Sequence, residues 1–174
     1  MRGPGGSTSE LERLLLRLAD KVPGYPYQLA LCARLSGQIE KRMADTANAA
    51  LKPLQLTYVL YQALMIIRGA EEGSIAPGEI AHLTGEKPNN VTHICNELAQ
   101  RKLISRHAGK KDRRRVEVAL TAAGRRLLAK AQPLIWAKWR QRFEGIGERE
   151  LVALPDLLRR QIENLDRATA AAPE

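Results

Sequence analysis

The sequence has few of the residues on which disulfide frameworks, metal sites and membrane spans depend. Its 174 residues include only two cysteines, Cys32 and Cys95, and their wide separation fits neither a metal site nor a disulfide framework. No apolar run reaches the ~20 residues needed to cross a bilayer. The Gly-, Pro- and Ser-containing start also lacks the apolar segment of a signal peptide. We therefore expect a protein of the reducing cytoplasm, with no membrane partner.

Aromatic residues are also scarce, at 4% of the chain, whereas hydrophobic residues make up 44% and are dominated by Leu and Ala. This mixture favours helices packed on helices. The three histidines, His82, His93 and His107, are not spaced as ligands on one helix face. The chain has no Gly-rich phosphate loop, nucleophile elbow or HExxH sequence. We therefore expect neither an enzyme nor a protein that depends on a metal or other cofactor.

Basic residues, in contrast, are abundant. The chain has 28 Lys and Arg against 19 Asp and Glu, a formal net charge of +9 and an isoelectric point near 9.9. Such a balance indicates a polyanionic partner, either nucleic acid or an acidic membrane surface.

The two ends of the chain have helical periodicity. After a flexible start at 1–8, two helices are predicted within 9–52, the first beginning at Ser9, where Ser9 and Glu12 have the spacing of a capping box. Pro23-Gly24 ends the first helix, and the second runs from about Pro26 to Ala50. Further helices are predicted within 123–166, followed by a flexible tail at 167–174. The last helix has a narrow apolar stripe, which resembles a coiled-coil seam and consists of Leu151, Leu154, Leu158, Ile162 and Leu165.

Two features of that last helix argue against a regular rod. Pro155 lies inside the stripe and is expected to kink the helix. The Ala-rich residues after Asp166 are expected to fray. The first and last helices nevertheless each offer an apolar stripe with no obvious partner inside the chain, and this predicts dimerisation regions at 9–52 and 123–166.

The middle of the chain, 53–122, has a different pattern. Two short helices begin at Pro77 and Pro88 and are joined by a tight turn at Gly85, which is typical of a helix-turn-helix. Ile80, Ala81 and Leu83 are predicted to face inward from the first of them. The periodicity then changes to two over 116–120, which with 103–107 predicts a β-hairpin. The fold class is therefore mainly α with a small β-hairpin wing: a winged helix-turn-helix domain plus a helical dimerisation region.

Two groups of residues in this middle segment are candidates for contact with DNA. The start of the second short helix offers polar side chains of the kind that reach base edges in the major groove; these are Lys87, Pro88, Asn89, Asn90, Thr92 and His93. Six of the ten residues in 106–115 are cations, which a hairpin cannot bury. With one acidic neighbour, the wing candidates are Arg106, Lys110, Lys111, Asp112, Arg113, Arg114 and Arg115.

The segment Asp112–Thr121 contains Asp-x-Arg followed after five residues by Leu-Thr, and it resembles the wing signature of the MarR family. The stretches at Leu56-Thr57 and from Glu97 to Arg106 also fit that family. The chain is similar to it from about residue 25 to the last helix. Two further segments, 25–28 and 73–79, look most like the branch of multidrug-efflux operon repressors.

The resemblance implies a triangular dimer built from the first and last helices, with two winged lobes that bind DNA. It implies that Asp112 orients Arg114 by a salt bridge, and that Arg114 enters the minor groove. It also implies a small, often aromatic and anionic effector that weakens DNA binding, in a pocket between the dimer helices and the DNA-binding lobe. One departure concerns base preference, since His93 stands where the family often has Arg.

Four residues near that junction are candidates for effector binding. Arg34 and Gln38 lie one turn apart on the second helix, and Tyr58 and Tyr61 lie three apart on the next. Together they would offer a cation, an amide and two rings to a small aromatic carboxylate. The alternative is that Arg34 pairs with Glu40 or solvent and that Tyr61 is a core residue.

The resulting functional hypothesis is a ligand-responsive transcriptional repressor that binds a palindromic operator as a homodimer and is released by a small aromatic, phenolic or anionic effector. One alternative is a thiol-based peroxide sensor, because Cys32 falls in the helix where such members of the family carry their reactive cysteine. Their partner tyrosine is replaced here by Ser36. A second alternative is an architectural DNA binder without an effector.

Overall fold

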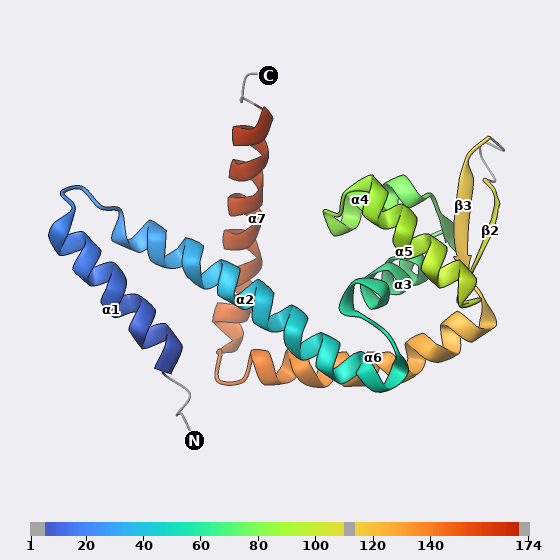
Figure 1. Ribbon diagram of the computed structural model, residues 1–174, viewed down its shortest axis with the longest axis horizontal. Helices are drawn as coiled ribbons and strands as arrows, with labels where there is room; N and C mark the ends of the chain where they lie inside the picture. Colours follow the sequence, from blue (N-terminus) through green and yellow to red (C-terminus); the bar gives the residue numbers. More distant parts are fainter. Residues whose placement is uncertain (1–5, 110–113, 171–174) are drawn as a thin grey trace. The chain divides into compact units, whose positions relative to one another are not determined.

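The computed structural model describes residues 6–109 and 114–170 (Figure 1). The chain forms two compact units, Met1–Ile135 and Trp136–Glu174, which are described separately below. The first unit holds all three strands and most of the helices, and the second holds the end of α6 and all of α7. The predicted fold class, mainly α with a small β wing, is confirmed.

The chain begins with two long helices that pack against each other, α1 (Gly6–Lys21) and α2 (Tyr27–Leu51). The turn between them contains Gly24, whose φ of +75° suits a residue without a side chain. The second helix was predicted within two residues at each end. The predicted helix start at Ser9 is wrong, because α1 begins at Gly6 and its regular backbone already includes Ser9.

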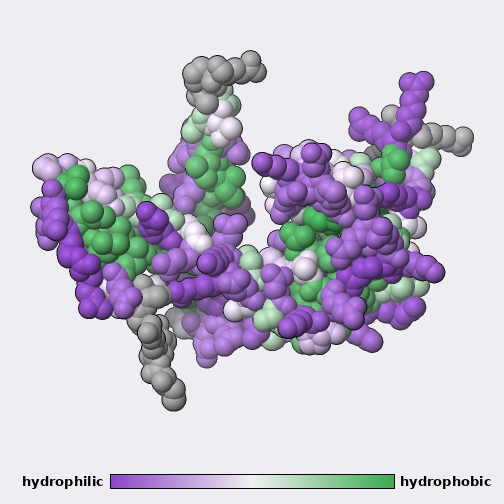
Figure 2. Space-filling view, viewed as in Figure 1, coloured by the Kyte–Doolittle hydropathy of each residue, from purple (hydrophilic) through white to green (hydrophobic). Residues whose placement is uncertain are grey.

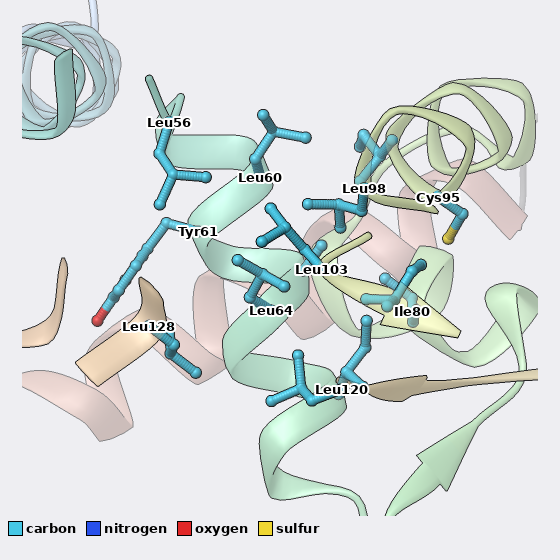
Figure 3. Close-up of a cluster of buried hydrophobic side chains, with 14 of the residues drawn as sticks. Leu56, Leu60, Tyr61, Leu64, Ile80, Cys95, Leu98, Leu103, Leu120 and Leu128 are labelled. Carbon is cyan, nitrogen blue, oxygen red and sulfur yellow. The ribbon is translucent and has the colours of Figure 1, made fainter. Parts of the chain in front are cut away.

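Helix α3 (Tyr58–Gly69) is the centre of the first unit. A short 3-10 turn, η1 (Lys52–Leu54), separates it from α2, and Thr57 caps its start by accepting a hydrogen bond from the Leu60 N–H at 3.3 Å. The side chain of Asn48, near the end of α2, accepts a 2.7 Å bond from the Tyr58 N–H. Figure 3 shows α3 side chains such as Leu60 and Leu64 surrounded by residues from the other elements of the core.

The predicted helix-turn-helix consists of α4 (Pro77–Thr84) and α5 (Pro88–Gln100), each with proline in its first turn. Gly85, in the left-handed conformation with φ +71°, ends α4. Ile80 and Ala81 are buried as predicted. Leu83 was predicted to face inward and is instead 62% exposed, because Ile80 and Ala81 form the buried side of this eight-residue helix.

The wing belongs to a three-stranded antiparallel sheet with strand order β1-β3-β2. Its strands are β1 (Ser74–Ile75), β2 (Ile104–Ala108) and β3 (Val116–Leu120). Val118 and Leu120 of β3 are buried, as the alternation predicted, but Val116 is 53% exposed. Val116 pairs with the exposed Ala108 at the far end of the hairpin. It lies on the same side of β3 as Val118 and Leu120, but that end of the strand extends past the core.

Helix α6 (Ala122–Arg142) is attached to the sheet by a compact hydrogen-bond cluster. The Thr121 hydroxyl accepts a 3.0 Å bond from the Gly124 N–H and donates a 2.7 Å bond to the Lys102 carbonyl, while the Thr121 N–H donates to the Leu103 carbonyl at 3.0 Å. Thr121 therefore caps the start of α6. The buried side chains of Leu128 and Ile135 then pack α6 against the core of the first unit.

The second unit is dominated by α7 (Glu148–Ala170). The helix continues through Pro155 and reaches Ala170, past Asp166, where the sequence predicted fraying. Pro155 is the eighth residue of the helix, and the helical backbone accommodates it without ending there. None of the α7 residues is buried, and most residues of its apolar stripe are exposed in the described part of the chain.

Over residues 6–109 and 114–170, none of the helices alone is both long and apolar enough to cross a bilayer. Only together would the segments Tyr27–Leu54 and Tyr58–Gly69 have the length and apolar composition of a span, and the chain bends by 81° between them.

The start of α6 generates a prediction about stability. A Cβ atom added at Gly124 would lie 2.1 Å from the Leu103 carbonyl oxygen, so Gly124→Ala must push α6 away from the sheet and disturb the Thr121 cluster. We expect Gly124→Ala to lower the free energy of unfolding by about 2 kcal/mol or more, in the upper range for overpacked sites. Chemical denaturation followed by circular dichroism measures this. Gly78→Ala is the matched control, because a Cβ there meets no atom within 4 Å; equal stability of the two variants would contradict the packing argument.

Candidate nucleic-acid interface

The start of α5 presents a polar, solvent-exposed face. Lys87 occupies the N-cap position with extended backbone and Pro88 is the first helical residue. Asn89, Thr92 and His93 follow at the spacing of three and four residues that places side chains on one helix face, and all three are exposed. The face also carries the positive end of the helix dipole, which favours an anion such as a phosphate.

Local hydrogen bonds hold part of this face in place. The Asn90 amide donates to a Glu86 carboxylate oxygen at 3.0 Å, and the Thr92 hydroxyl donates to the Pro88 carbonyl at 3.0 Å. Asn90 is thus tied to the connection between α4 and α5, and Thr92 to its own first turn. Local hydrogen bonds therefore restrain two of the polar side chains at the start of α5, Asn90 and Thr92.

The wing adds cations beside this helix. Arg106 lies on β2, and Arg114 and Arg115 directly precede β3; all three are exposed. The Gly109 N–H donates to the Arg115 carbonyl at 2.8 Å and closes the hairpin below its tip. The other four wing candidates, Lys110, Lys111, Asp112 and Arg113, lie outside the described residues. Figure 2 shows a largely hydrophilic surface over α4, α5 and the wing.

One contact joins α5 directly to the wing. An Arg106 guanidinium nitrogen (Nη2) donates to the Asn96 side-chain oxygen at 2.5 Å. Asn96 was not among the residues singled out from the sequence, although it follows His93 by three positions and Asn89 by seven and so continues the same helix face. The strand pairing that brings Arg106 to Asn96 is a tertiary feature, whereas the helical spacing was visible in the sequence.

The two cysteines lie in very different surroundings. Cys95 on α5 is buried, and burial raises the pKa of its thiol, opposed in part by the nearby Arg106 cation. A protonated, enclosed thiol is a packing residue. Cys32 on α2 is exposed, and the Ser36 hydroxyl donates to its backbone carbonyl at 2.9 Å. This bond goes to the backbone and leaves the sulfur without support from Ser36.

Two of the four predicted effector residues lie together. The rings of Tyr58 and Tyr61 stack with their centroids 6.3 Å apart. Tyr61 is only 1% exposed, and within the described part of the chain its hydroxyl has no hydrogen-bond partner. Burial, and secondarily Tyr58, raise the pKa of Tyr61. In Figure 3 the Tyr61 hydroxyl points away from Leu60 and Leu64.

The other two, Arg34 and Gln38, are elsewhere. Asn48 contacts Tyr58, and Arg34 precedes Asn48 by fourteen residues in the same helix, which corresponds to about 21 Å along its axis. Arg34 is exposed, and the Gln38 side-chain oxygen accepts a 3.3 Å bond from Arg42. The fold of one chain therefore does not gather the four residues around a single cavity.

A cavity of about 330 Å³ that the sequence did not predict lies between the end of α3, β1 and α4. Its lining includes Glu71, Glu72, Glu79 and Glu117, and Ser74 donates a 2.6 Å bond to Glu117. Four carboxylates would repel an anionic effector. Among residues 6–109 and 114–170, no group of three or more His, Cys, Asp or Glu side chains is arranged to hold a metal ion.

Comparison with known proteins gives relatives along most of the chain. No protein-family model matches it. It is 27% identical over 161 residues to the transcriptional repressor MprA of Escherichia coli K12, covering 92% of each chain. The fold is similar to CouR of Rhodococcus jostii RHA1 bound to p-coumaroyl-CoA, with 28% identity, a TM-score of 0.67, and coverage of 72% of this chain and 87% of CouR. It is also similar to a MarR variant of E. coli complexed with operator DNA, with 20% identity, a TM-score of 0.67, and coverage of 82% and 96%.

Proposed function

Since the chain belongs to the MarR family of DNA-binding transcriptional regulators, we propose that it is a repressor that binds a palindromic operator as a homodimer and is released by a small aromatic, phenolic or anionic effector. The observation that carries the proposal is the pairing of an exposed polar helix start with an exposed cationic hairpin in one compact unit.

The two halves of this surface have different tasks in DNA binding. The start of α5 would enter the major groove, where Asn89 and His93 present hydrogen-bonding groups to base edges. The wing cations, including Arg106, Arg114 and Arg115, would lie against phosphates and release counterions, which adds affinity that does not depend on sequence. Specificity would then come from α5 and most of the affinity from the wing.

Exposed apolar side chains support the homodimer. In the first unit, Leu14 and Leu16 of α1 and Leu29 and Ile39 of α2 are exposed. In the second unit, α7 exposes an apolar stripe for most of its length, and Figure 2 shows apolar surface on both α1 and α7. Surfaces of this extent are typical of interaction sites. A twofold dimer would cover them and set two recognition helices about one DNA turn, ~34 Å, apart.

The stacked tyrosines support the effector. A buried hydroxyl without a partner costs about 1–3 kcal/mol, and a ligand oxygen or carboxylate at Tyr61 would recover that loss. The adjacent ring of Tyr58 would offer an aromatic ligand a stacking surface. The CouR structure contains p-coumaroyl-CoA, which supports an aromatic effector for this chain. The single chain does not bring Arg34 and Gln38 to the tyrosine pair, so their part in effector binding remains a prediction from the sequence.

Release requires that the effector prefer one conformation over another. Tyr58 sits where α2 meets α3, held by the Asn48 bond. A ligand seated at the tyrosine pair would act on that connection. Because α3 also packs against α4 and α5, a shift there would change how the recognition helix is presented to DNA.

The first prediction of this subsection concerns the wing. Arg114→Ala should weaken binding to any duplex and make the slope of log affinity against log salt shallower by about one, as expected for one lost phosphate contact. Fluorescence anisotropy with the protein's own upstream DNA and an unrelated duplex, over a series of salt concentrations, measures both effects. Arg160→Ala on α7 is the control and should leave the slope unchanged. Asp112→Ala should also reduce affinity if Asp112 aims Arg114, so tighter binding would contradict the orienting role.

The second concerns assembly. Leu158→Glu together with Ile162→Glu places two charges on the apolar stripe of α7, where each buried aliphatic side chain would contribute about 1.5–3 kcal/mol. We expect the double variant to sediment as a monomer at micromolar concentration and the native chain as a dimer. Arg160→Glu, on the opposite side of the same helix, should leave the dimer intact. A native chain that is monomeric under these conditions would overturn the homodimer.

The third concerns the effector. Tyr61→Phe keeps the ring and removes the buried, unpartnered hydroxyl, so the variant should fold at least as stably as the native chain and still bind DNA. We expect it to lose response to benzoate, 4-hydroxybenzoate and p-coumaroyl-CoA, whichever of them releases the native protein from DNA. Tyr27→Phe, on α2, is the matched control. An unchanged dose–response of Tyr61→Phe would show that the effector binds elsewhere.

A further inference from the structure

Strand register places Arg106 on the inner face of the wing. Arg106 pairs directly with Val118, and Val118 is fully buried. Directly paired residues project from the same face of a sheet, and Ile104, two residues before Arg106, is also buried on that face. The Arg106 side chain therefore starts on the side of the sheet that packs against α5, rather than on the outer side with Ser105 and His107.

An arginine in that position needs a polar partner, because a cation next to the core is costly unless it is hydrogen-bonded. Burial raises the pKa of the Cys95 thiol, and the Arg106 guanidinium lies close enough for its charge to oppose that effect. The guanidinium ends at the Asn96 side-chain oxygen, 2.5 Å from Nη2. Asn96 is exposed, so the contact lies at the rim where α5, β2 and solvent meet.

The partner is an amide and not a carboxylate, and this difference determines the charge at the rim. An amide oxygen directs the guanidinium without neutralising it, whereas a carboxylate would form an ion pair and cancel its charge. Among the described residues, two acids near the wing bond elsewhere: Glu97 pairs with Arg101 at 3.3 Å, and Glu117 accepts from Ser74. The full positive charge of Arg106 is thus held at a defined place between helix and wing.

We propose that Asn96 is a positioning residue for DNA binding, which holds the Arg106 guanidinium at the junction of α5 and β2 so that it contacts a phosphate at the edge of the groove that α5 enters. Asn96 lies two turns beyond Asn89, past the part of a recognition helix that reaches bases. Its side-chain oxygen is engaged by Arg106, which disfavours the paired hydrogen bonds by which asparagine reads adenine. Its role is therefore to aim Arg106, and this inference rests on the DNA-binding function proposed above.

The test is a double-mutant cycle on the full-length protein with the protein's own upstream DNA as the probe. Asn96→Ala and Arg106→Ala should each weaken binding about tenfold, the usual scale for one charge-assisted hydrogen bond. If Asn96 acts through Arg106, Asn96→Ala should have no further effect in the Arg106→Ala background. Arg106→Ala should also make the salt slope shallower by about one. Fully additive losses would overturn the proposal, because they would mean that the two residues contribute independently.

A second pair of variants distinguishes a positioning role of Asn96 from a purely structural link to Arg106. Asn96→Asp should preserve the link to Arg106 and the thermal stability, yet make the salt slope shallower, since the cation is then neutralised. Gln100→Asp, one turn further along α5, measures the direct repulsion of DNA by a new carboxylate. If the link between Asn96 and Arg106 is purely structural, Asn96→Asp and Gln100→Asp should affect DNA binding equally. That result would also overturn the proposal. If the native protein itself binds no duplex DNA, the proposed function fails instead.

Discussion

The burial of α3 is the constraint on which the first unit depends. This twelve-residue helix contacts α2, α4, α5, β1 and β3, and its side chains at 60, 61, 63, 64 and 67 are almost completely enclosed. Each fully buried Leu or Ile contributes about 1.5–3 kcal/mol, so α3 supplies much of the free energy that keeps the helix-turn-helix against the sheet. The same helix carries the stacked tyrosines, which places a candidate effector site directly on the core.

A second constraint joins the sheet to α6. Gly124 approaches the Leu103 carbonyl so closely that no side chain fits, and the bonds of Thr121 link the same two segments. The strand that leads into the wing and the helix that leads out of it are thereby held at one place. Arg106 and Asn96 join the wing to α5 at another. The cationic hairpin is thus held against α5 and does not depend on its own short strands alone.

The exposed apolar side chains of α7 have a different role from the buried core of the first unit. The core of the first unit is closed by residues from several elements, whereas α7 has no buried residue of its own and exposes Leu, Ile and Val along its length. A helix of this composition gains little stability from intrinsic propensity alone. The physical requirement for a covering surface is what supports the proposed self-association of the chain.

Local patterns in the sequence predicted the type of most of the elements. Proline at the first turns of α4 and α5, glycine at 85 and the alternation at 116–120 act over a few residues, so they predicted the helix-turn-helix and wing. Capping signals were less reliable, since Ser9 lies inside α1. Only the tertiary structure decided which distant side chains meet. Strand register aimed Arg106 at Asn96, and the length of α2 kept Arg34 away from Tyr61, because spacing along a chain does not specify proximity across it.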